Sequence, residues 1–330
     1  MLLLTATDLR ASLPMPSAIE AMREAFRCIA EGRVEIPLRT AIRVPGRDAV
    51  MLVMPARCDL PLGLGGKLVS VFPRNRARGL PAIHATVVLL DPDTGAPRAL
   101  VEGTALTAVR TGAVSGLATE LLARKDATVL AVIGAGAQAR TQVEAVCCVR
   151  RIERVLVYSR TAAHAERFAE EVRGRGPVPG DVRAVASVAD AVGAADVVCT
   201  ATASPDPVLR VEHVRPGLHV NAVGSFTPAM RELDPALIGR ADLVAVDQRA
   251  AAMAEAGEVI AAIELGVAEE GRLVELGDLV VGRVAGRSRG EDVTVFKSVG
   301  LAIQDLAAAG RAVEVAAREG RGIEVDMTEG

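Results

Sequence analysis

The chain has 330 residues, of which 50% are hydrophobic and 24% are charged, and its formal net charge is −3. This length favours two domains, because single hydrophobic cores stop growing at about 250–300 residues. The balanced charge offers no basic surface for nucleic acid, and no apolar run approaches the roughly 18–20 residues that span a bilayer. The five cysteines form no CxxC pair and no metal-ligand spacing, and the N-terminus lacks an export signal. We therefore expect a cytoplasmic protein without a metal.

The N-terminal and C-terminal segments predict an α+β domain that is discontinuous in sequence. Helices are expected at about 16–32 and 104–123, and longer strands are expected within 39–44, 49–55, 65–72 and 82–91. Residues 295–319 have helical periodicity, and residues 322–327 resemble one more strand. We infer that this last helix returns to the first domain. The predicted boundaries are 1–115 with 305–330 for this domain, and 116–304 for the other.

The central part of the chain predicts parallel βαβ units. Short apolar strands are expected within six ranges that alternate with helices, namely 128–134, 154–160, 182–186, 196–202, 218–224 and 243–247. Near-continuous apolar strands of this kind are covered by helices on both faces. The pattern predicts an α/β fold with a doubly wound Rossmann sheet.

A phosphate-binding turn follows the first of these strands. It reads Gly134-Ala135-Gly136-Ala137-Gln138-Ala139 and opens a helix, which is the context that makes this weak motif informative. Gly134 permits a tight turn, Gly136 lets the backbone approach a diphosphate, and small Ala139 lets helix and strand pack closely. The helix N-terminus adds unpaired N–H groups and a favourable dipole. A chance Gly-Ala turn is the alternative.

The end of the second strand bears on the choice of cofactor. An NAD enzyme usually has Asp or Glu there to bind the ribose hydroxyls, whereas this chain has Ser159-Arg160-Thr161. Arginine can bind a 2′-phosphate through two N–H groups. NADP(H) is favoured and NAD(H) stays possible, since Arg160 is alternatively a solvated loop residue.

Three cationic residues of the first domain are candidates for binding a small carboxylate. They are Arg39 in PLRTAIRV, Lys67 in GLGGKLVSVFPRN and Arg110 in LTAVRTGAVSG. In a chain rich in arginine, each arginine alone is more often a surface charge. Lys67 is more informative, because it is one of only three lysines and precedes an apolar strand.

The chain resembles the ornithine cyclodeaminase/mu-crystallin family over nearly its whole length. The matching segments are PLRT, GGKLVSVFPRN, LDPDTG, LTAVRTGAVSGLAT, VIGAGAQA, NAVGSFTPAMRELD and VFKSVGLAIQDL. The resemblance implies a homodimer formed through the non-Rossmann domain and an active site between the domains. It implies that Arg39, Lys67 and Arg110 hold the substrate carboxylate, with Lys67 closest to the chemistry. It also implies a set of residues that line the cofactor, namely Thr111, Ala137, Gln138, Thr202, Val223, Gly224 and Ser298.

One position departs from part of this family. Ornithine cyclodeaminases and archaeal alanine dehydrogenases have an aspartate shortly after the fifth Rossmann strand, where this chain has Phe226. Phenylalanine cannot accept a proton or orient a water molecule. The sequence here is most similar to that of the ketimine reductases. We expect Phe226 and Val299 to contact the substrate. His84 is a candidate proton donor or pocket residue, or alternatively an ordinary packing residue of its strand.

The favoured function is reduction of a cyclic ketimine carboxylate by NAD(P)H, giving L-proline or L-pipecolate, with Lys67 as the catalytic residue. Two alternatives stay open. One is ornithine cyclodeamination or an alanine-dehydrogenase-like reaction, which an acidic side chain from another loop would support. The other is a non-catalytic protein that binds NADPH and a small ligand.

Overall fold

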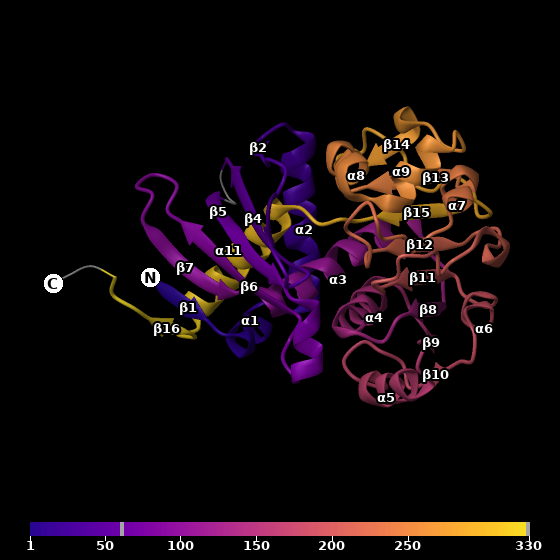
Figure 1. Ribbon diagram of the computed structural model, residues 1–330, viewed down its shortest axis with the longest axis horizontal. Coiled ribbons are helices and arrows are strands. Elements are labelled where there is room, and N and C mark those ends of the chain that lie inside the picture. Colours follow the sequence, from indigo (N-terminus) through magenta and orange to yellow (C-terminus); the bar gives the residue numbers. More distant parts are fainter. Residues whose placement is uncertain (60–62, 328–330) are drawn as a thin grey trace. The chain divides into compact units, whose positions relative to one another are not determined.

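The computed structural model describes residues 1–59 and 63–327, which form two compact units (Figure 1). The first unit comprises Met1–Arg110 and Leu301–Gly330, and the second comprises Thr111–Gly300. The divisions at 110/111 and 300/301 precede the expected boundaries at 115/116 and 304/305 by five and four residues. The first division lies within a continuous helix, α3 (Gly103–Leu122), so no loop marks it in the sequence.

The first unit contains an eight-stranded, mainly antiparallel sheet. Its order is β16-β1-β7-β6-β5-β4-β2, and β3 pairs with β4 outside this path. The strands are β1 (Leu2–Leu4), β2 (Val34–Glu35), β3 (Thr40–Val44), β4 (Ala49–Cys58), β5 (Gly63–Val71), β6 (Ile83–Leu90), β7 (Pro97–Glu102) and β16 (Ile323–Glu324). Side chains alternate between the two faces of such strands. One face is buried and the other is largely exposed: Met54 and Val87 are buried, whereas their neighbours along the strands are accessible.

Helices cover the buried face of this sheet. They are α1 (Ala6–Ser12), α2 (Met15–Ala30) and α11 (Ala302–Arg318), and a 3₁₀ turn, η1, spans Pro73–Arg78. α11 packs against α1, α2, β4, β5 and β6. Its first two turns are buried on all sides even though they contain Gln304 and Asp305. Buried polar side chains need partners, so this part of α11 is a place to look for a site.

The second unit is built on an eight-stranded parallel sheet with the order β10-β9-β8-β11-β12-β15-β13-β14. The strands are β8 (Val129–Ile133), β9 (Arg154–Tyr158), β10 (Val182–Ala184), β11 (Val197–Thr200), β12 (His219–Ala222), β13 (Leu243–Val246), β14 (Leu273–Glu275) and β15 (Thr294–Lys297). The strand order reverses between β8 and β11: β9 and β10 extend the sheet on one side of β8, and β11 begins the other side. In open α/β sheets, ligands bind outside the carboxyl ends of the strands at such a point.

Short helices connect these strands. They are α4 (Ala137–Val149), α5 (Ala162–Val172), α6 (Val188–Val192), η2 (Val211–His213), α7 (Pro235–Arg240), α8 (Arg249–Glu255), α9 (Gly257–Glu264), η3 (Glu270–Arg272) and α10 (Leu276–Val280). The predicted α/β class and Rossmann sheet are confirmed, and all six predicted strands are present. The expectation of one helix over 295–319 was wrong. Thr294–Lys297 form β15 between β12 and β13, and the helix begins only at Ala302.

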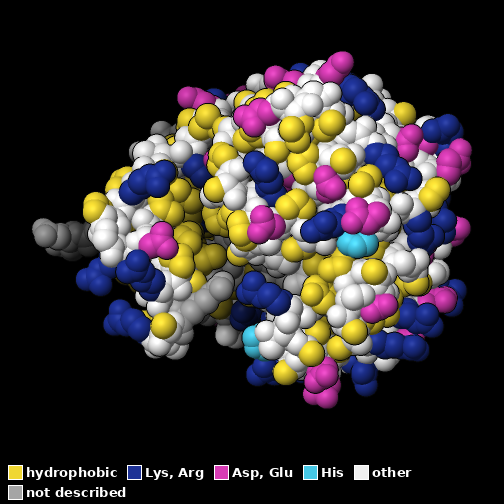
Figure 2. Space-filling view, turned by 45° about the vertical axis from the view of Figure 1, so that its right-hand side comes forward, with side chains coloured by type: hydrophobic (Ala, Val, Ile, Leu, Met, Phe, Trp, Pro, Cys, Tyr) yellow, Lys and Arg dark blue, Asp and Glu magenta, His cyan; other side chains and the backbone are white. Residues whose placement is uncertain are grey.

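The surface carries charges of both signs. Figure 2 shows Lys and Arg side chains interspersed with Asp and Glu over the visible face, which fits the small net charge of −3. Within the described chain, no helix is long and apolar enough to cross a membrane.

Candidate active site

A buried cluster of charged side chains lies between the sheet and helices of the first unit. Lys67 comes from β5, Arg110 from α3 and Asp305 from the first turns of α11. The Lys67 Nζ lies 2.7 Å from Asp305 Oδ2, and the Arg110 Nε lies 3.1 Å from Asp305 Oδ1. Two of the three predicted cations therefore share one carboxylate that the sequence analysis did not identify.

Polar side chains complete this cluster. The Arg110 Nη1 donates a hydrogen bond of 2.8 Å to Gln304 Oε1, and the Lys67 Nζ lies 3.4 Å from Thr107 Oγ1. Lys67, Arg110 and Asp305 are only 3%, 6% and 0% exposed. Two cations and one anion leave a buried surplus of positive charge. Such a surplus favours binding of an anion, and arginine in particular matches the geometry of a carboxylate.

Electrostatics single out Lys67 among the cations. The pKa of Lys67 is lowered to about 8, mainly by burial; the carboxylate of Asp305 opposes this decrease, and the charges of Arg110 and Arg39 add to it. Arg39 is half-buried in the segment between β2 and β3, and its charge acts on Lys67 from there. A lysine whose pKa lies near the working pH can donate a proton as well as supply charge.

The structure does not bring His84 to this cluster. In β6, His84 pairs with Ser70, whereas Val87 pairs with Lys67. Because the faces alternate along each strand, His84 lies on the face opposite to Lys67, and it is exposed. Its predicted contact with the substrate stays a prediction that this register does not support.

The phosphate turn has the geometry that its sequence predicts. Gly134 has a φ of +109°, and a Cβ there would lie 2.6 Å from the Ala201 carbonyl oxygen. Gly136 is the exposed N-cap of α4, with no heavy atom within 4 Å of an added Cβ. Ala139 is fully buried in the core beneath the turn. A diphosphate site needs a tight turn, an open approach to the backbone and close packing of helix on strand, and these occur at Gly134, Gly136 and Ala139 respectively.

Neighbouring residues support binding of a dinucleotide at this turn. Ala137 is exposed in the first turn of α4, where main-chain N–H groups lack helical partners. The Gln138 Oε1 is buried and has no hydrogen-bond partner among the described residues. The Thr111 carbonyl accepts a 3.0 Å hydrogen bond from Gln142 Nε2 of the same helix, α4. A buried acceptor without a donor, beside an open helix N-terminus, fits a ligand rich in hydroxyl and phosphate groups.

A cavity of about 330 Å³ adjoins the turn. It is lined by Ala135, Arg140, His164, Arg167, Phe168 and Glu171. Arg140 is ion-paired with Glu171 and lies 5.6 Å from the centre of the Phe168 ring. Ser159 and Arg160 follow β9, and Thr161 is the N-cap of α5. Arg160 and Thr161 are exposed, which leaves them accessible to a ligand.

Glu232 fixes the ends of two neighbouring strands and was missed by the sequence analysis. Its fully buried carboxylate accepts hydrogen bonds of 2.6 Å from the backbone N–H groups of Thr202 and Gly224. Thr202 follows β11 and Gly224 follows β12. A Cβ at Gly224 would lie 2.1 Å from the Thr202 carbonyl oxygen, so only glycine fits there. Val223 is buried beside it.

Asp247 holds the segment that follows β15. Its Oδ2 accepts hydrogen bonds from the Ser298 hydroxyl (2.8 Å) and from the backbone N–H groups of Val299 (2.8 Å) and Gly300 (2.7 Å). Asp247 follows β13, so the carboxyl ends of adjacent strands are again tied together by a buried acid. Ser298 is thereby fixed at this edge of the sheet. Val299 is buried, and its predicted contact with the substrate stays a prediction.

A second buried network surrounds the residue that precedes Phe226. The Lys297 Nζ donates hydrogen bonds of 2.6 Å to the Ser225 carbonyl and hydroxyl oxygens and lies 3.2 Å from Glu258 Oε1. The Ser225 hydroxyl lies 2.8 and 2.9 Å from the two oxygens of Glu258. Phe226 itself is half-buried. The nearby acid is therefore already paired with a buried cation.

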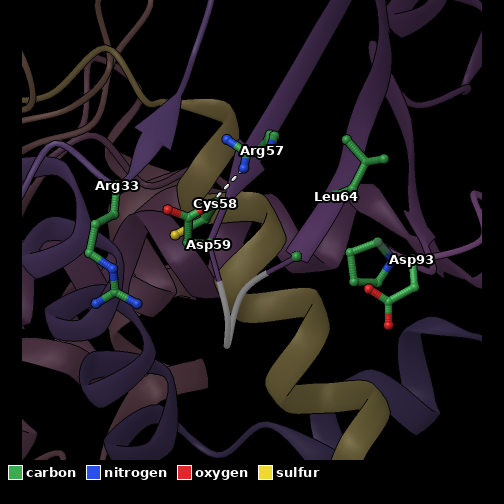
Figure 3. A pocket seen from close by; sticks show the side chains of 8 residues that line it. Arg33, Arg57, Cys58, Asp59, Leu64 and Asp93 are labelled. Atoms are coloured by element: carbon green, nitrogen blue, oxygen red, sulfur yellow. Dashed lines mark hydrogen bonds and ion pairs between the residues drawn. The ribbon is translucent and has the colours of Figure 1, made fainter.

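A larger cavity, of about 500 Å³, lies elsewhere in the first unit. Figure 3 shows its lining at the ends of β4 and β5, including Arg57, which forms an ion pair of 2.7 Å with Asp59. No predicted site residue lines it, so it is not part of the candidate active site. Over residues 1–59 and 63–327, no group of three or more His, Cys, Asp or Glu side chains is placed to hold a metal ion.

The chain is similar to known proteins over nearly its whole length. The sequence matches the ornithine cyclodeaminase/mu-crystallin family over residues 1–320. A Δ1-pyrroline-2-carboxylate reductase of Bacillus cereus is 39% identical over 310 residues, which are 94% of each chain. The structure of Thermococcus litoralis Δ1-pyrroline-2-carboxylate reductase in complex with NADH and L-proline has a TM-score of 0.94 and 40% identity. It covers 98% of this chain and 100% of that chain. An archaeal alanine dehydrogenase dimer with bound NAD has a TM-score of 0.91 and 33% identity, covering 99% of both chains.

Proposed function

Because this chain belongs to the ornithine cyclodeaminase/mu-crystallin family, we propose that it is an oxidoreductase that uses a nicotinamide cofactor to reduce a cyclic imine. The substrate is a ketimine carboxylate, Δ1-pyrroline-2-carboxylate or Δ1-piperideine-2-carboxylate, and the product is L-proline or L-pipecolate. The observation that carries this proposal is the buried cluster of Lys67, Arg110 and Asp305, with its surplus of positive charge. The first unit then binds the substrate and the second binds the cofactor.

The protein's part in the reaction is to hold a carboxylate and to supply positive charge. When bound, the reduced cofactor supplies a hydride to the imine carbon. Arg39, Lys67 and Arg110 hold the substrate carboxylate, and Lys67 is also the catalytic residue nearest the C=N bond. The product needs one proton on nitrogen, which the ring brings when it arrives protonated and which Lys67 otherwise donates. Orientation and preorganised charge supply most of the rate.

The residues at the carboxyl edge of the Rossmann sheet are assigned to the cofactor. We assign the diphosphate to the main-chain N–H groups of the turn from Gly134 to Ala139, and the unpartnered Gln138 Oε1, which needs a donor, to a hydroxyl group of the cofactor. The nicotinamide half of the cofactor is assigned to a second set of residues, namely Thr111, Thr202, Val223, Gly224 and Ser298. The buried acids Glu232 and Asp247 support this assignment, because they fix Thr202, Gly224 and Ser298 by direct hydrogen bonds.

NADPH is the preferred cofactor in this proposal, because Ser159-Arg160-Thr161 contains no acid to bind ribose hydroxyls. We expect Arg160→Ala to raise the Kd for NADPH about tenfold or more, as a charge-assisted hydrogen bond is worth roughly 1.5–3 kcal/mol. The Kd for NADH should change little. Fluorescence titration of both cofactors measures this. Arg151→Ala is the control, since Arg151 is exposed in the same unit. An equal loss for both cofactors would contradict the phosphate contact.

A spectrophotometric panel tests the proposed reaction. Oxidation of NADPH or NADH is followed with Δ1-pyrroline-2-carboxylate, Δ1-piperideine-2-carboxylate, and pyruvate plus ammonia as separate substrates. The proposal requires that a cyclic imine is reduced fastest. If every substrate fails while the cofactor still binds tightly, the chain is a cofactor-dependent binding protein instead.

We also propose that the chain forms a homodimer through the exposed face of the first unit's sheet. Leu68 and Ile42 lie on the same face of the sheet as His84, opposite to the face that carries Lys67. Their side chains are 46% and 52% exposed. Exposed apolar surface on a regular sheet is typical of an interface. The cytoplasm is the proposed compartment, and it suits the five free cysteines.

Leu68→Asp is expected to convert the dimer to a monomer, because a carboxylate cannot be buried unpaired in an apolar interface. Light scattering after size exclusion should give the monomer mass of 34.2 kDa for this variant and twice that mass for the unmodified protein. Leu265→Asp is the control, since Leu265 is an exposed leucine of the second unit. A dimer that survives Leu68→Asp would place the interface elsewhere.

A further inference from the structure

We propose that Asp305 is a positioning residue for the reaction: its buried carboxylate holds the Lys67 ammonium and the Arg110 guanidinium side by side as a preformed receptor for the substrate carboxylate. This inference rests on the proposed function, because that function assigns Lys67 and Arg110 to the substrate.

The geometry gives each oxygen of Asp305 a different cation. Oδ1 lies 3.1 Å from the Arg110 Nε, and Oδ2 lies 2.7 Å from the Lys67 Nζ. Asp305 lies in the first turns of α11, where the helix dipole favours a negative charge. The Oε1 of the preceding residue, Gln304, accepts a hydrogen bond of 2.8 Å from the Arg110 Nη1. Two successive residues of one helix therefore set the position of Arg110, and one of them also sets that of Lys67.

The charge balance argues for more than packing. Replacing a buried ion pair by apolar residues is often neutral or stabilising, so a pair alone is weak evidence of a stabilising role. Here two cations share one anion, and all three are nearly inaccessible to water. A buried surplus of positive charge is unfavourable until an anion enters. Asp305 reduces that surplus enough for the two cations to be adjacent, but leaves a net charge that attracts a carboxylate.

The other charges that shift the pKa of Lys67 belong to two arginines. Arg110 lies on α3 and Arg39 on the segment before β3, and both lower the pKa of Lys67. The residues that α1, α2, β4 and β6 bury are otherwise uncharged, although Cys28 and Cys58 are among them. Burial raises the pKa of the Cys58 thiol to about 12, so it stays neutral near pH 8. Among the groups that the structure describes around Lys67, Asp305 is the negative charge that keeps it protonated.

The direction of the pH effect follows from these contacts. The pKa of Lys67 is about 8 because burial lowers it and Asp305 only partly opposes that decrease. Lysine is charged below its pKa, so binding of a carboxylate should weaken as the pH rises through about 8. Without the charge of Asp305, the same loss should occur at a lower pH. An opposite charge at this distance typically moves a pKa by about one unit or more.

The test is Asp305→Asn, which keeps the shape of the side chain and removes its charge. The chain has three lysines, Lys67, Lys125 and Lys297, so NMR of protein labelled with ¹³Cε-lysine can follow Lys67 directly. Its signal, assigned by loss in Lys67→Met, should titrate near pH 8 in the unmodified protein and at lower pH in the variant. This measurement needs no catalytic activity, so it stands even if the proposed reaction is wrong.

Ligand binding provides the second measurement. Pyrrole-2-carboxylate is a suitable probe because its ring nitrogen does not titrate between pH 6 and 9. In Asp305→Asn, its Kd at pH 6 should be equal to or below that of the unmodified protein, because a repelling carboxylate is gone. Between pH 6 and 8.5 the Kd should rise about tenfold more in the variant than in the unmodified protein. A purely structural role would weaken binding equally at all pH values.

Asp196→Asn is the matched control. Asp196 is also a buried acid with two arginine partners, Arg124 at 3.4 Å and Arg215 at 3.0 Å, but it lies at the amino end of β11. This variant should leave the Lys67 titration unchanged. If Asp305→Asn does not fold, adding Lys67→Met should restore folding by removing the unpaired ammonium. An unchanged titration in Asp305→Asn, or a double variant that stays unfolded, would overturn the proposal.

Discussion

Replacement of Arg110 by alanine is expected to raise the KM for Δ1-pyrroline-2-carboxylate at least about 30-fold while leaving the Kd for the cofactor nearly unchanged. Removing one partner of a buried, hydrogen-bonded charge pair costs about 2–5 kcal/mol. Arg110 is 6% exposed, and its contacts with Asp305 and Gln304 all lie in the first unit. Initial-rate kinetics with cofactor titration separate the two effects.

Two further variants make this test specific. Arg110→Lys keeps the charge but loses the planar group with several donors, so its KM should lie between those of the unmodified protein and the alanine variant. Arg150→Ala removes a partly buried arginine of the second unit that donates to backbone carbonyls of Thr119, Ala123 and Arg124. That variant should lose stability but keep its KM. A KM for Arg110→Ala within about threefold of the unmodified value would exclude Arg110 from the substrate site.

The fold was predictable where local pattern and tertiary structure agree. The strand at 128–134 and the turn from Gly134 to Ala139 carry their own signals, since buried parallel strands are apolar and a tight turn requires glycine. Gly134 does have a positive φ, and Ala139 does pack into the core. These features depend on a few consecutive residues, which is why the sequence alone was sufficient.

The assignment of residues 295–319 to one helix was wrong for an identifiable reason. Short buried strands and buried helices are both apolar, so periodicity does not distinguish them. Thr294–Lys297 become a strand because β12 and β13 lie on either side of it, a pairing that joins segments distant in sequence. Lys297 lies at its end and is paired with Glu258 inside the core. A rare lysine at the end of an apolar run was the available signal.

The charged cluster was predictable only in part. Arg110 and Lys67 were identified from their sequence context, but their shared partner is 195 and 238 residues away along the chain. Asp305 appears in the sequence as one of two acids, with Glu314, in an alanine-rich helix. The available sign in the sequence is that all residues from Ala302 to Ala309 are apolar except Gln304 and Asp305, so the first turns of this helix are apolar on nearly every side. Two polar residues in a fully buried helix indicate a site, and that inference requires knowing that the helix is buried.

The unmodified protein is expected to release no proline from L-ornithine, although it reduces a preformed cyclic imine. Cyclodeamination first oxidises an amine and therefore needs a base, whereas imine reduction can begin from a ring nitrogen that is already protonated. A placed general acid or base contributes typically 10²–10⁴-fold. Phe226 provides none, and Glu258 is fully buried and paired with Lys297 and Ser225. The oxidative half-reaction should therefore be slower by about that factor.

Phe226→Asp tests this explanation, because it places a carboxylate at the position where the family resemblance predicts the aspartate of the cyclodeaminases. The variant should gain ornithine-dependent reduction of NADP⁺ or NAD⁺, measured together with ammonia release, and should reduce the cyclic imine less well. Phe226→Ala is the control: it removes the ring without adding a base, so it should weaken imine reduction and gain no activity with ornithine. Ser225, which Lys297 and Glu258 hold in place, keeps the backbone of both variants fixed beside the substitution. Release of ammonia and proline from ornithine by the unmodified protein would mean that a base from another residue serves the amine, and the chain would then be a cyclodeaminase.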